Sequence, residues 1–149
     1  MSGVLVRRAD PGDLTVLAPL LDDYRVFYGQ PSDPGTARDF LQARLERSES
    51  VVFLATLEGR PAGFTQLYPL FTTVGLAPIW LLNDLYVAPQ ARRSGVARAL
   101  LDAAREHGRD TGARRLMLNT ERGNLAAQAA YEGHGWQRDE RFLTYELPL

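Results

Sequence analysis

The stretch Trp80-Leu81-Leu82-Asn83-Asp84-Leu85-Tyr86-Val87, followed by Gln90-Ala91-Arg92-Arg93-Ser94-Gly95-Val96-Ala97, decides the fold of this chain. The first run is typical of a strand, and the second is a turn that leads directly into an amphipathic helix. A helix that starts from a small-residue turn leaves backbone N–H groups unpaired at its positive end. Gly95 and Ala97 carry little bulk, and Arg92 and Arg93 supply positive charge. The sequence therefore predicts a pyrophosphate site.

Two common nucleotide-binding patterns do not fit this turn. It lacks the Gly-Lys-Ser/Thr ending of a P-loop, and no Gly-x-Gly-x-x-Gly follows the first strand as in a dinucleotide fold. A basic turn before a helix is also common as a solvated loop, so the segment by itself leaves that alternative open.

The spacing of apolar residues predicts the other elements of the chain. We expect strands at residues 4–7, 51–57, 62–70, 80–87, 116–120 and 142–147, and helices at residues 14–27, 36–48, 95–111 and 124–132. Asp10 to Asp13 offers helix-start chemistry, and Pro19 is expected to kink or split the first helix. The loop between the two central strands is expected at residues 72–78. Strands mixed with helices around a hairpin predict an α/β or α+β mixed sheet.

Composition narrows the class of protein. The 149 residues, 45% hydrophobic and 23% charged, predict a single domain spanning residues 1–149. A net charge of −1 disfavours a nucleic-acid binder. The absence of cysteine excludes disulfides, thiolate metal sites and a cysteine nucleophile. The two histidines, His107 on a charged helix surface and His134 in a loop, disfavour a metal site. Without a membrane-spanning run or a signal peptide, a cytoplasmic protein is expected.

The pattern Arg92-x-x-Gly95-x-Ala97 resembles the Gln/Arg-x-x-Gly-x-Gly/Ala signature of the GNAT acetyltransferase superfamily. The preceding Asp84-Leu85-Tyr86-Val87-Ala88-Pro89 resembles that family's fourth strand and the turn after it. Asn124 to Glu132, with Gly135-Trp136, resembles its second signature. The resemblance covers residues 4–147. It implies the GNAT fold, a mixed sheet of about six to seven strands flanked by about four helices and splayed at strands 4 and 5.

The resemblance also implies a co-substrate, acetyl-CoA, and a set of residues that bind it. The end of the fourth strand would pair with the pantetheine arm, and the turn would hold the pyrophosphate. The implied cofactor-binding residues are Leu85, Tyr86, Val87, Arg92, Arg93, Ser94, Gly95, Val96, Ala97, Arg98, Asn124 and Tyr131. Arg98 fits a solvated helix residue equally well, and Asn124 also fits the N-cap of its helix.

Three residues are candidates for catalysis, in which the amine attacks the thioester directly. Tyr131 matches the family tyrosine that protonates the leaving thiolate, since a phenol with an ordinary pKa of about 10 is protonated at neutral pH. Its alternative role is a core aromatic. Asp84 is a candidate base, or a structural residue at a strand bulge. Glu121 is the alternative base.

The acceptor implied by the resemblance is a primary amine. Polyamine acetyltransferases of the superfamily carry Glu-Asp where this chain has Asn83-Asp84, and an amide cannot take a proton. The implied substrate-binding residues are Asp23, Tyr24, Tyr28 and Asn83, which suit a cationic amine.

The chain looks most similar to the polyamine and histone-type branch, so the expected acceptor is a small polyamine-like cation or a protein lysine or N-terminus. A homodimer without nucleic-acid or membrane partners is implied. The alternative function is a non-catalytic acyl-CoA-binding or regulatory module.

Overall fold

The computed structural model describes residues 3–149, in two compact units that meet between Asn119 and Thr120. The first unit holds a five-stranded sheet in the order β1-β2-β3-β4-β5. Its strands are β1 (Val4–Arg8), β2 (Val51–Leu57), β3 (Arg60–Thr72), β4 (Ala77–Val87) and β5 (Leu116–Met117). Neighbouring strands from β1 to β4 are antiparallel, and β5 runs parallel to β4. The mixed α/β class expected from the sequence is confirmed.

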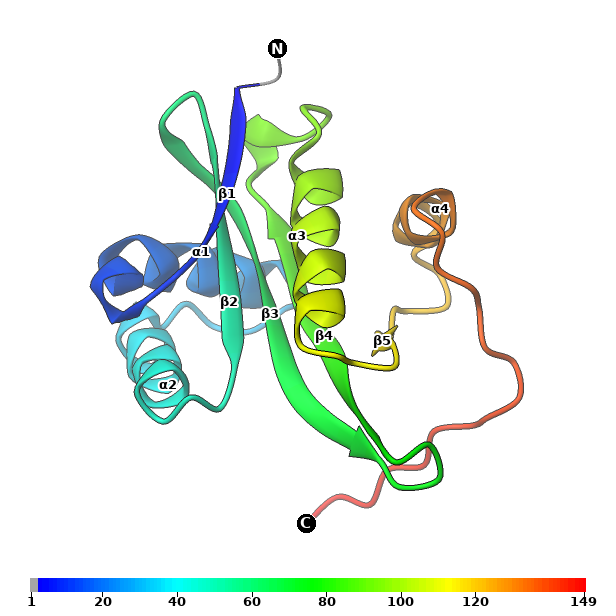
Figure 1. The fold of residues 1–149 in the computed structure, drawn as a ribbon. Coiled ribbons are helices and arrows are strands. Elements are labelled where there is room, and N and C mark those ends of the chain that lie inside the picture. Colours follow the sequence, from blue (N-terminus) through cyan, green and yellow to red (C-terminus); the bar gives the residue numbers. More distant parts are fainter. Residues whose placement is uncertain (1–2) are drawn as a thin grey trace. The chain divides into compact units, whose positions relative to one another are not determined.

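Helices cover both faces of this sheet, as Figure 1 shows. The helices α1 (Leu14–Phe27) and α2 (Pro34–Glu46) lie on one face, and α3 (Val96–Asp110) lies on the other. Because successive side chains of a strand point to opposite faces, Val52 and Leu54 pack with α1 and α2, whereas Phe53 and Ala55 join the core beneath α3. The sheet therefore separates two apolar cores.

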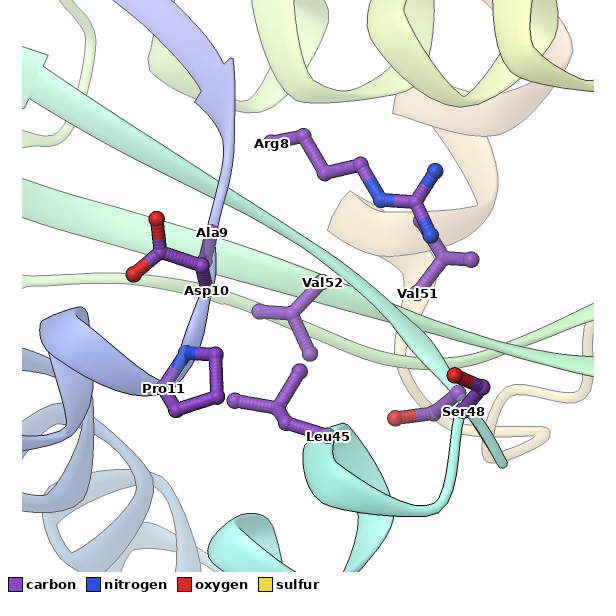
Figure 2. Close-up of a pocket in the computed structure, with 9 residues that line it drawn as sticks. Arg8, Ala9, Asp10, Pro11, Leu45, Ser48, Val51 and Val52 are labelled. Atoms are coloured by element: carbon purple, nitrogen blue, oxygen red, sulfur yellow. The ribbon is translucent and has the colours of Figure 1, made fainter.

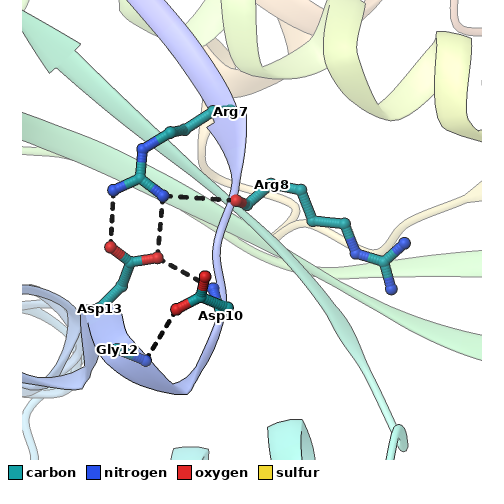
Figure 3. A network of polar contacts seen from close by, with 5 residues as sticks. All are labelled: Arg7, Arg8, Asp10, Gly12 and Asp13. Carbon is teal, nitrogen blue, oxygen red and sulfur yellow. Dashed lines mark hydrogen bonds and ion pairs between the residues drawn. The ribbon is translucent and has the colours of Figure 1, made fainter.

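The path from β1 into α1 is held by carboxylates, as Figure 3 shows. Asp10 caps a short 3-10 helix (Pro11–Asp13) by accepting from the N–H of Gly12 at 2.8 Å, and Asp13 accepts from the N–H of Asp10 at 2.9 Å. The Arg7 guanidinium binds both oxygens of Asp13, at 2.6 and 2.9 Å, and this hydrogen bonding lowers the pKa of Asp13. The helix start expected at Asp10 to Asp13 is confirmed.

Pro19 does not split the first helix. The helix α1 is continuous from Leu14 to Phe27, so of the two outcomes expected at Pro19 the division into two pieces is wrong. A proline removes one i to i−4 hydrogen bond, and the neighbouring Leu17, Ala18, Leu20 and Leu21 are all buried. Their packing keeps the helix in one piece.

The central hairpin is longer than the sequence indicated, and it contains a bulge. β3 and β4 pair up to Thr72 and Ala77, so the loop expected at residues 72–78 shrinks to residues 73–76. The hydroxyl of Thr72 accepts from the N–H of Gly75 at 3.2 Å, which closes this tight turn. Further along, Gln66 pairs with Asp84 while Leu67 pairs with Leu82. Asn83 is therefore an extra residue in β4, and a bulge of this kind bends its strand.

Two strands differ from expectation. The strand expected at residues 116–120 is limited to Leu116–Met117, and residues 142–147 belong to no strand of the structure. The described sheet thus has five strands where about six to seven were expected. The alternation of Phe142, Leu143, Tyr145 and Leu147 is a local pattern, but a strand forms only through backbone hydrogen bonds to a neighbour, and these side chains are 69% to 89% exposed.

The second unit contains one helix, α4 (Leu125–Gly133), close to the residues expected for it. No helix within residues 3–149 is long and apolar enough to cross a membrane.

Candidate functional site

The turn after β4 presents unpaired backbone N–H groups. Arg93 and Gly95 both have left-handed backbones, with φ of 62° and 82°, between a second short 3-10 helix (Pro89–Ala91) and α3. Gly95 is the N-cap of α3 and offers no side-chain acceptor. The first N–H groups of a helix have no carbonyl partner within it, so those of Val96, Ala97 and Arg98 need an acceptor from outside. An anion meets that need.

A surface hollow of about 210 Å³ lies on this turn. It is lined by Val87, Ala91, Arg92, Arg93, Gly95, Val96, Ala97 and Arg98. A Cβ placed on Gly95 would meet no other atom within 4 Å, so the space in front of the glycine is open. Ser94 does not line the hollow, and its hydroxyl donates to the carbonyl of Arg92 at 3.4 Å. The other residues expected for the pyrophosphate share one concave, basic surface.

The end of β4 has an open edge in residues 3–119. β5 pairs with β4 only at Trp80 and Leu81, so within these residues no strand covers that edge from Leu82 to Val87. The side chains of Leu85 and Val87 pack into the core beneath α3. An uncovered strand edge can bind an extended, amide-bearing chain by β-type hydrogen bonds. The splay expected between strands 4 and 5 is confirmed, and it opens next to the hollow.

A buried polar network surrounds Asp84 at the β4 bulge. The Asp84 carboxylate accepts from Gln66 Nε2 at 2.8 Å and from Asn83 Nδ2 at 3.1 Å. Gln66 Oε1 accepts from the Ser50 hydroxyl at 2.8 Å, and the Thr65 hydroxyl donates to the Asp84 carbonyl at 2.8 Å. These contacts favour the structural interpretation of Asp84. Gln66 and Ser50 were missed from the sequence, because no short motif marks them.

The residues of α1 and its C-cap that are expected to bind the amine substrate lie beside β4. The Tyr24 ring makes edge contacts with the rings of Tyr28, Phe64 and Tyr86, at centroid distances of 5.1, 5.8 and 5.8 Å. Asp23 is exposed on the same helix. Burial raises the pKa of Tyr86, and the charge of Asp23 raises that pKa further. Asp23, Tyr24 and Tyr28 therefore gather around the aromatic end of β4.

Arg92 and Asp22 lie near this cluster and make contacts of different kinds. The Arg92 guanidinium lies over the Phe27 ring, 5.8 Å from its centroid, and Arg92 Nε donates to the Val87 carbonyl at 3.4 Å. These contacts join the end of α1 to the turn at Arg92–Ala97. Asp22, in contrast, is buried and accepts from the Ser32 hydroxyl and the Asp33 N–H, both at 2.6 Å. Asp22 holds the α1–α2 loop.

The remaining candidates lie in residues 120–149. Asn124 is the N-cap of α4, because its Oδ1 accepts from the N–H of Ala127 at 3.1 Å. The Tyr131 ring is half-buried and lies 6.1 Å from the Trp136 ring, centroid to centroid. The Glu121 side chain is exposed, and its carbonyl accepts from Gln128 Nε2 at 3.2 Å. The cofactor role of Asn124 and the catalytic roles of Tyr131 and Glu121 stay predictions.

His134 lies in the turn after α4, as expected, whereas His107 differs from expectation. His134 is buried at the C-cap of α4, and its Nδ1 accepts from Trp136 Nε1 at 3.0 Å. His107 is half-buried rather than on the surface, with its ring 5.7 Å from that of Phe53 and 4.7 Å from that of Trp80. Its sequence neighbours are charged, but helical periodicity turns residue 107 towards the sheet. Within residues 3–149 no cluster of three or more His, Cys, Asp or Glu could hold a metal ion.

Comparison with known proteins agrees with this geometry. The profile of the Acetyltransferase (GNAT) family matches residues 17–136, which include parts of both units. An uncharacterized N-acetyltransferase of Bacillus subtilis (strain 168), YhfO, is 44% identical over 142 residues, 95% of each chain. An aminoglycoside N(6')-acetyltransferase type 1 of Stenotrophomonas maltophilia is 30% identical over 152 residues, 99% of this chain and 95% of that one.

Solved structures show the same fold. The crystal structure of a probable acetyltransferase superposes with a TM-score of 0.92 at 44% identity, covering 97% of each chain. The named relatives are YhfO and aminoglycoside acetyltransferases, so the expected placement in the polyamine and histone-type branch is not supported. An uncapped helix start, an open strand edge and these similarities lead to one conclusion: the chain belongs to the acetyltransferase (GNAT) family and is an acetyl-CoA-dependent N-acetyltransferase.

Proposed function

We propose that this enzyme transfers the acetyl group of acetyl-CoA directly to a primary amine of a small polycationic acceptor. The first candidate is an amino sugar of the aminoglycoside type, because the Stenotrophomonas relative carries that name and matches nearly the whole chain. A polyamine or a protein amine is the next candidate. The exposed carboxylate of Asp23 and the rings of Tyr24 and Tyr28 suit a cation, through charge and through ring faces.

One observation carries the cofactor part of this proposal. The open edge of β4 at Leu82–Val87 leads directly to the uncapped start of α3 at Gly95. Pantetheine is an extended chain with two amides, and it is joined to a pyrophosphate. The β4 edge would pair with the amides, and the N–H groups of Val96, Ala97 and Arg98 would bind the pyrophosphate. Arg92 and Arg93 would balance its charge.

The transfer needs two proton movements. The neutral amine attacks the carbonyl carbon of the thioester, the C–S bond breaks, and the sulfur leaves as a thiolate. The proposed acid, Tyr131, gives its phenol proton to that thiolate. The amine proton passes to a base, for which Asp84 and Glu121 remain the candidates. The two amide hydrogen bonds to Asp84 favour Glu121 or a water molecule as the direct acceptor.

Acetyl-CoA consumption against a panel of amines tests the proposal. We expect turnover with an aminoglycoside, weaker turnover with a polyamine such as spermidine, and little with a peptide N-terminus. Asn83, whose amide accepts no proton where polyamine enzymes have Glu, is the observation that favours a non-catalytic module. Calorimetry that detects acetyl-CoA binding, with no consumption for any amine, would support that alternative.

Removing one hydroxyl tests the proposed acid. Tyr131→Phe keeps the ring beside Trp136, so we expect acetyl-CoA affinity to change little. General acid catalysis is worth about 10²–10⁴-fold, and turnover should fall by that factor. Tyr145→Phe removes an exposed hydroxyl of the same unit and serves as the matched control. Turnover of Tyr131→Phe within about twofold of the parent, with chemistry limiting the rate, would return Tyr131 to a packing role.

The homodimer implied by the family resemblance stays a prediction. Light scattering at micromolar concentration should give twice the chain mass of 16.6 kDa. A monomer mass under those conditions contradicts it.

A further inference from the structure

Gln66 is only 1% exposed, and among the polar side chains of residues 3–149 only Thr65 beside it, at 0%, is more deeply buried. The proposed reaction does not use the Gln66 side chain directly. We propose that Gln66 is a positioning residue for acetyl transfer, acting by fixing the Asp84 carboxylate and the β4 bulge at Asn83. This inference rests on the proposed function, because the bulge lies on the strand that would bind the pantetheine arm.

The orientation of the Gln66 amide is set by its neighbours. The NH₂ end of the Gln66 amide faces Asp84 and donates to Oδ2 at 2.8 Å, and Gln66 Oε1 accepts from the Ser50 hydroxyl, also at 2.8 Å. A carboxylate only accepts, and an amide has one accepting end and one donating end. The Asp84 carboxylate thereby fixes the Gln66 amide with its NH₂ end towards Asp84, and the Ser50 hydroxyl satisfies the remaining amide oxygen.

The position of this network in the sheet is unusual. Among residues 3–119, the buried polar or charged side chains are Asp22 and four members of the network, Ser50, Thr65, Gln66 and Asp84. Burying a polar group costs free energy unless its hydrogen bonds are satisfied, and an apolar replacement of both partners is often as stable. The adjacent buried residues Phe64, Leu67 and Leu82 are apolar. A polar cluster at this one place therefore points to a local geometric task.

That task is the direction of β4 beyond the bulge. The last residue of β4 that pairs with β5 is Leu81, and the bulge follows two residues later at Asn83. The Thr65 hydroxyl binds the Asp84 carbonyl at 2.8 Å, while Gln66 and Asn83 bind its carboxylate. Side chains thus bind both the backbone carbonyl and the carboxylate of Asp84. Since a bulge bends and twists its strand, this hold sets where the open edge at Leu85 and Val87 is presented.

Ser50 also borders a hollow on the surface. This hollow, of about 210 Å³, is lined in part by Arg8, Ser48 and Val51, which Figure 2 shows around it. Because Ser50 lines this hollow, we expect the structure to accept one additional methyl group on its side chain. Ser50→Thr therefore keeps the hydroxyl and tests rescue, while Ser50→Ala removes the hydroxyl alone.

Gln66→Glu is the central test, because it keeps the shape of the side chain and replaces the donor by an acceptor. We expect kcat to fall by about 10- to 100-fold at neutral pH, since small misplacements near reacting groups have effects of this size. The KM for acetyl-CoA should stay within about threefold. Relative to the parent, kcat should recover as the pH is lowered, because a proton shared between the two carboxylates restores a donor. A purely structural role would not produce this pH dependence.

Gln42→Glu is the matched control. Gln42 lies on α2, and its amide donates to Glu46 at 2.8 Å, outside the network. The same substitution there should leave kcat and its pH profile as in the parent. If Gln66→Glu fails to fold, as judged by circular dichroism, the Ser50 pair decides: Ser50→Ala should lower kcat by about 3- to 10-fold at unchanged acetyl-CoA affinity, and Ser50→Thr should restore it.

The outcomes separate the two proposals. A parent that transfers acetyl, together with a folded Gln66→Glu variant of parental kcat and pH profile, overturns the positioning role alone. A Ser50→Thr variant as slow as Ser50→Ala also contradicts it. A parent that binds acetyl-CoA but acetylates no amine overturns the proposed function and the positioning role with it.

Discussion

The turn at Arg92–Ala97 and the bulge at Asn83–Asp84 lie on either side of the open edge of β4, and they are built in opposite ways. The turn leaves backbone N–H groups of α3 without partners and places no side-chain cap there. The bulge, in contrast, surrounds one residue with side chains, so that both the carbonyl and the carboxylate of Asp84 are bound. The turn therefore has backbone donors that an external anion would satisfy, whereas the bulge is already satisfied by the protein itself.

This difference separates binding from positioning. A site with unpaired N–H groups binds an anion because the anion supplies the missing hydrogen-bond acceptors. A site that is satisfied internally is rigid, and it can present neighbouring groups in one geometry. We therefore expect changes at the turn to appear in acetyl-CoA affinity, and changes at the bulge to appear in stability or turnover.

The largest expected effect is that of Gly95→Glu at the turn. The substitution places bulk and negative charge in the open hollow and puts a side chain on a left-handed backbone. Acetyl-CoA binding should be lost in calorimetry. Gly112→Glu is the matched control, because Gly112 has φ of 71° at the other end of α3 and has equally open space. Normal binding by Gly95→Glu would mean that the pyrophosphate lies elsewhere.

Gly63→Ala tests the close approach of β3 and β4 between the turn and the bulge. A Cβ on Gly63 would lie 2.3 Å from the Tyr86 carbonyl oxygen, so the strands would have to move apart. Forcing extra atoms into a packed site costs about 1–3 kcal/mol. We expect the free energy of unfolding, measured with urea, to fall by an amount near the upper end of this range. Gly123→Ala, where the added Cβ meets nothing within 4 Å, should be near neutral. Equal stabilities of the two variants would show that the β3–β4 spacing adapts.

Arg92→Ala should weaken acetyl-CoA binding by about tenfold, or about 1.4 kcal/mol. We propose that its guanidinium, which lies over Phe27, balances the phosphate charge. The loss should shrink at high salt, because exposed charges are screened. Arg105→Ala, which breaks a 2.8 Å ion pair with Asp102 on the same helix, should leave the affinity unchanged. If Arg92→Ala lost turnover but kept the parental affinity for acetyl-CoA, Arg92 would act in positioning, as proposed for the bulge, and not in binding.

The smallest expected effect is a pH dependence of stability from His107, far along α3 from the turn. Burial against Phe53 and Trp80 lowers the pKa of His107 below its ordinary 6.5. Above that value the imidazole is neutral in both states, so its contribution to stability is complete. As the pH falls below 6.5, the unfolded chain binds a proton that the folded chain does not, and stability is lost. In urea unfolding from pH 7.5 to 5, His107→Gln should show a weaker decline than the parent.

Elements with strong local signals could be predicted. The strand at residues 51–57 was predicted with the bounds that the structure has, and α3 and α4 differ from prediction by one residue at most at each end. The strand expected at residues 142–147 fails, although Phe142, Leu143 and Tyr145 carry a strand-like pattern. Apolar periodicity is a property of the segment itself, whereas strand pairing depends on a neighbour that the segment does not encode.

The sequence by itself determined the turn at Arg92–Ala97, because the conformations of Arg93 and Gly95 and the start of α3 depend on residues within a few positions. Only the tertiary structure decided the network at Asp84. Its hydrogen bonds join residues 16, 18 and 19 positions apart, and they form because β2, β3 and β4 are paired in one register with Asn83 as the extra residue. A register of this kind results from packing two cores against one sheet, and no short stretch of sequence contains it.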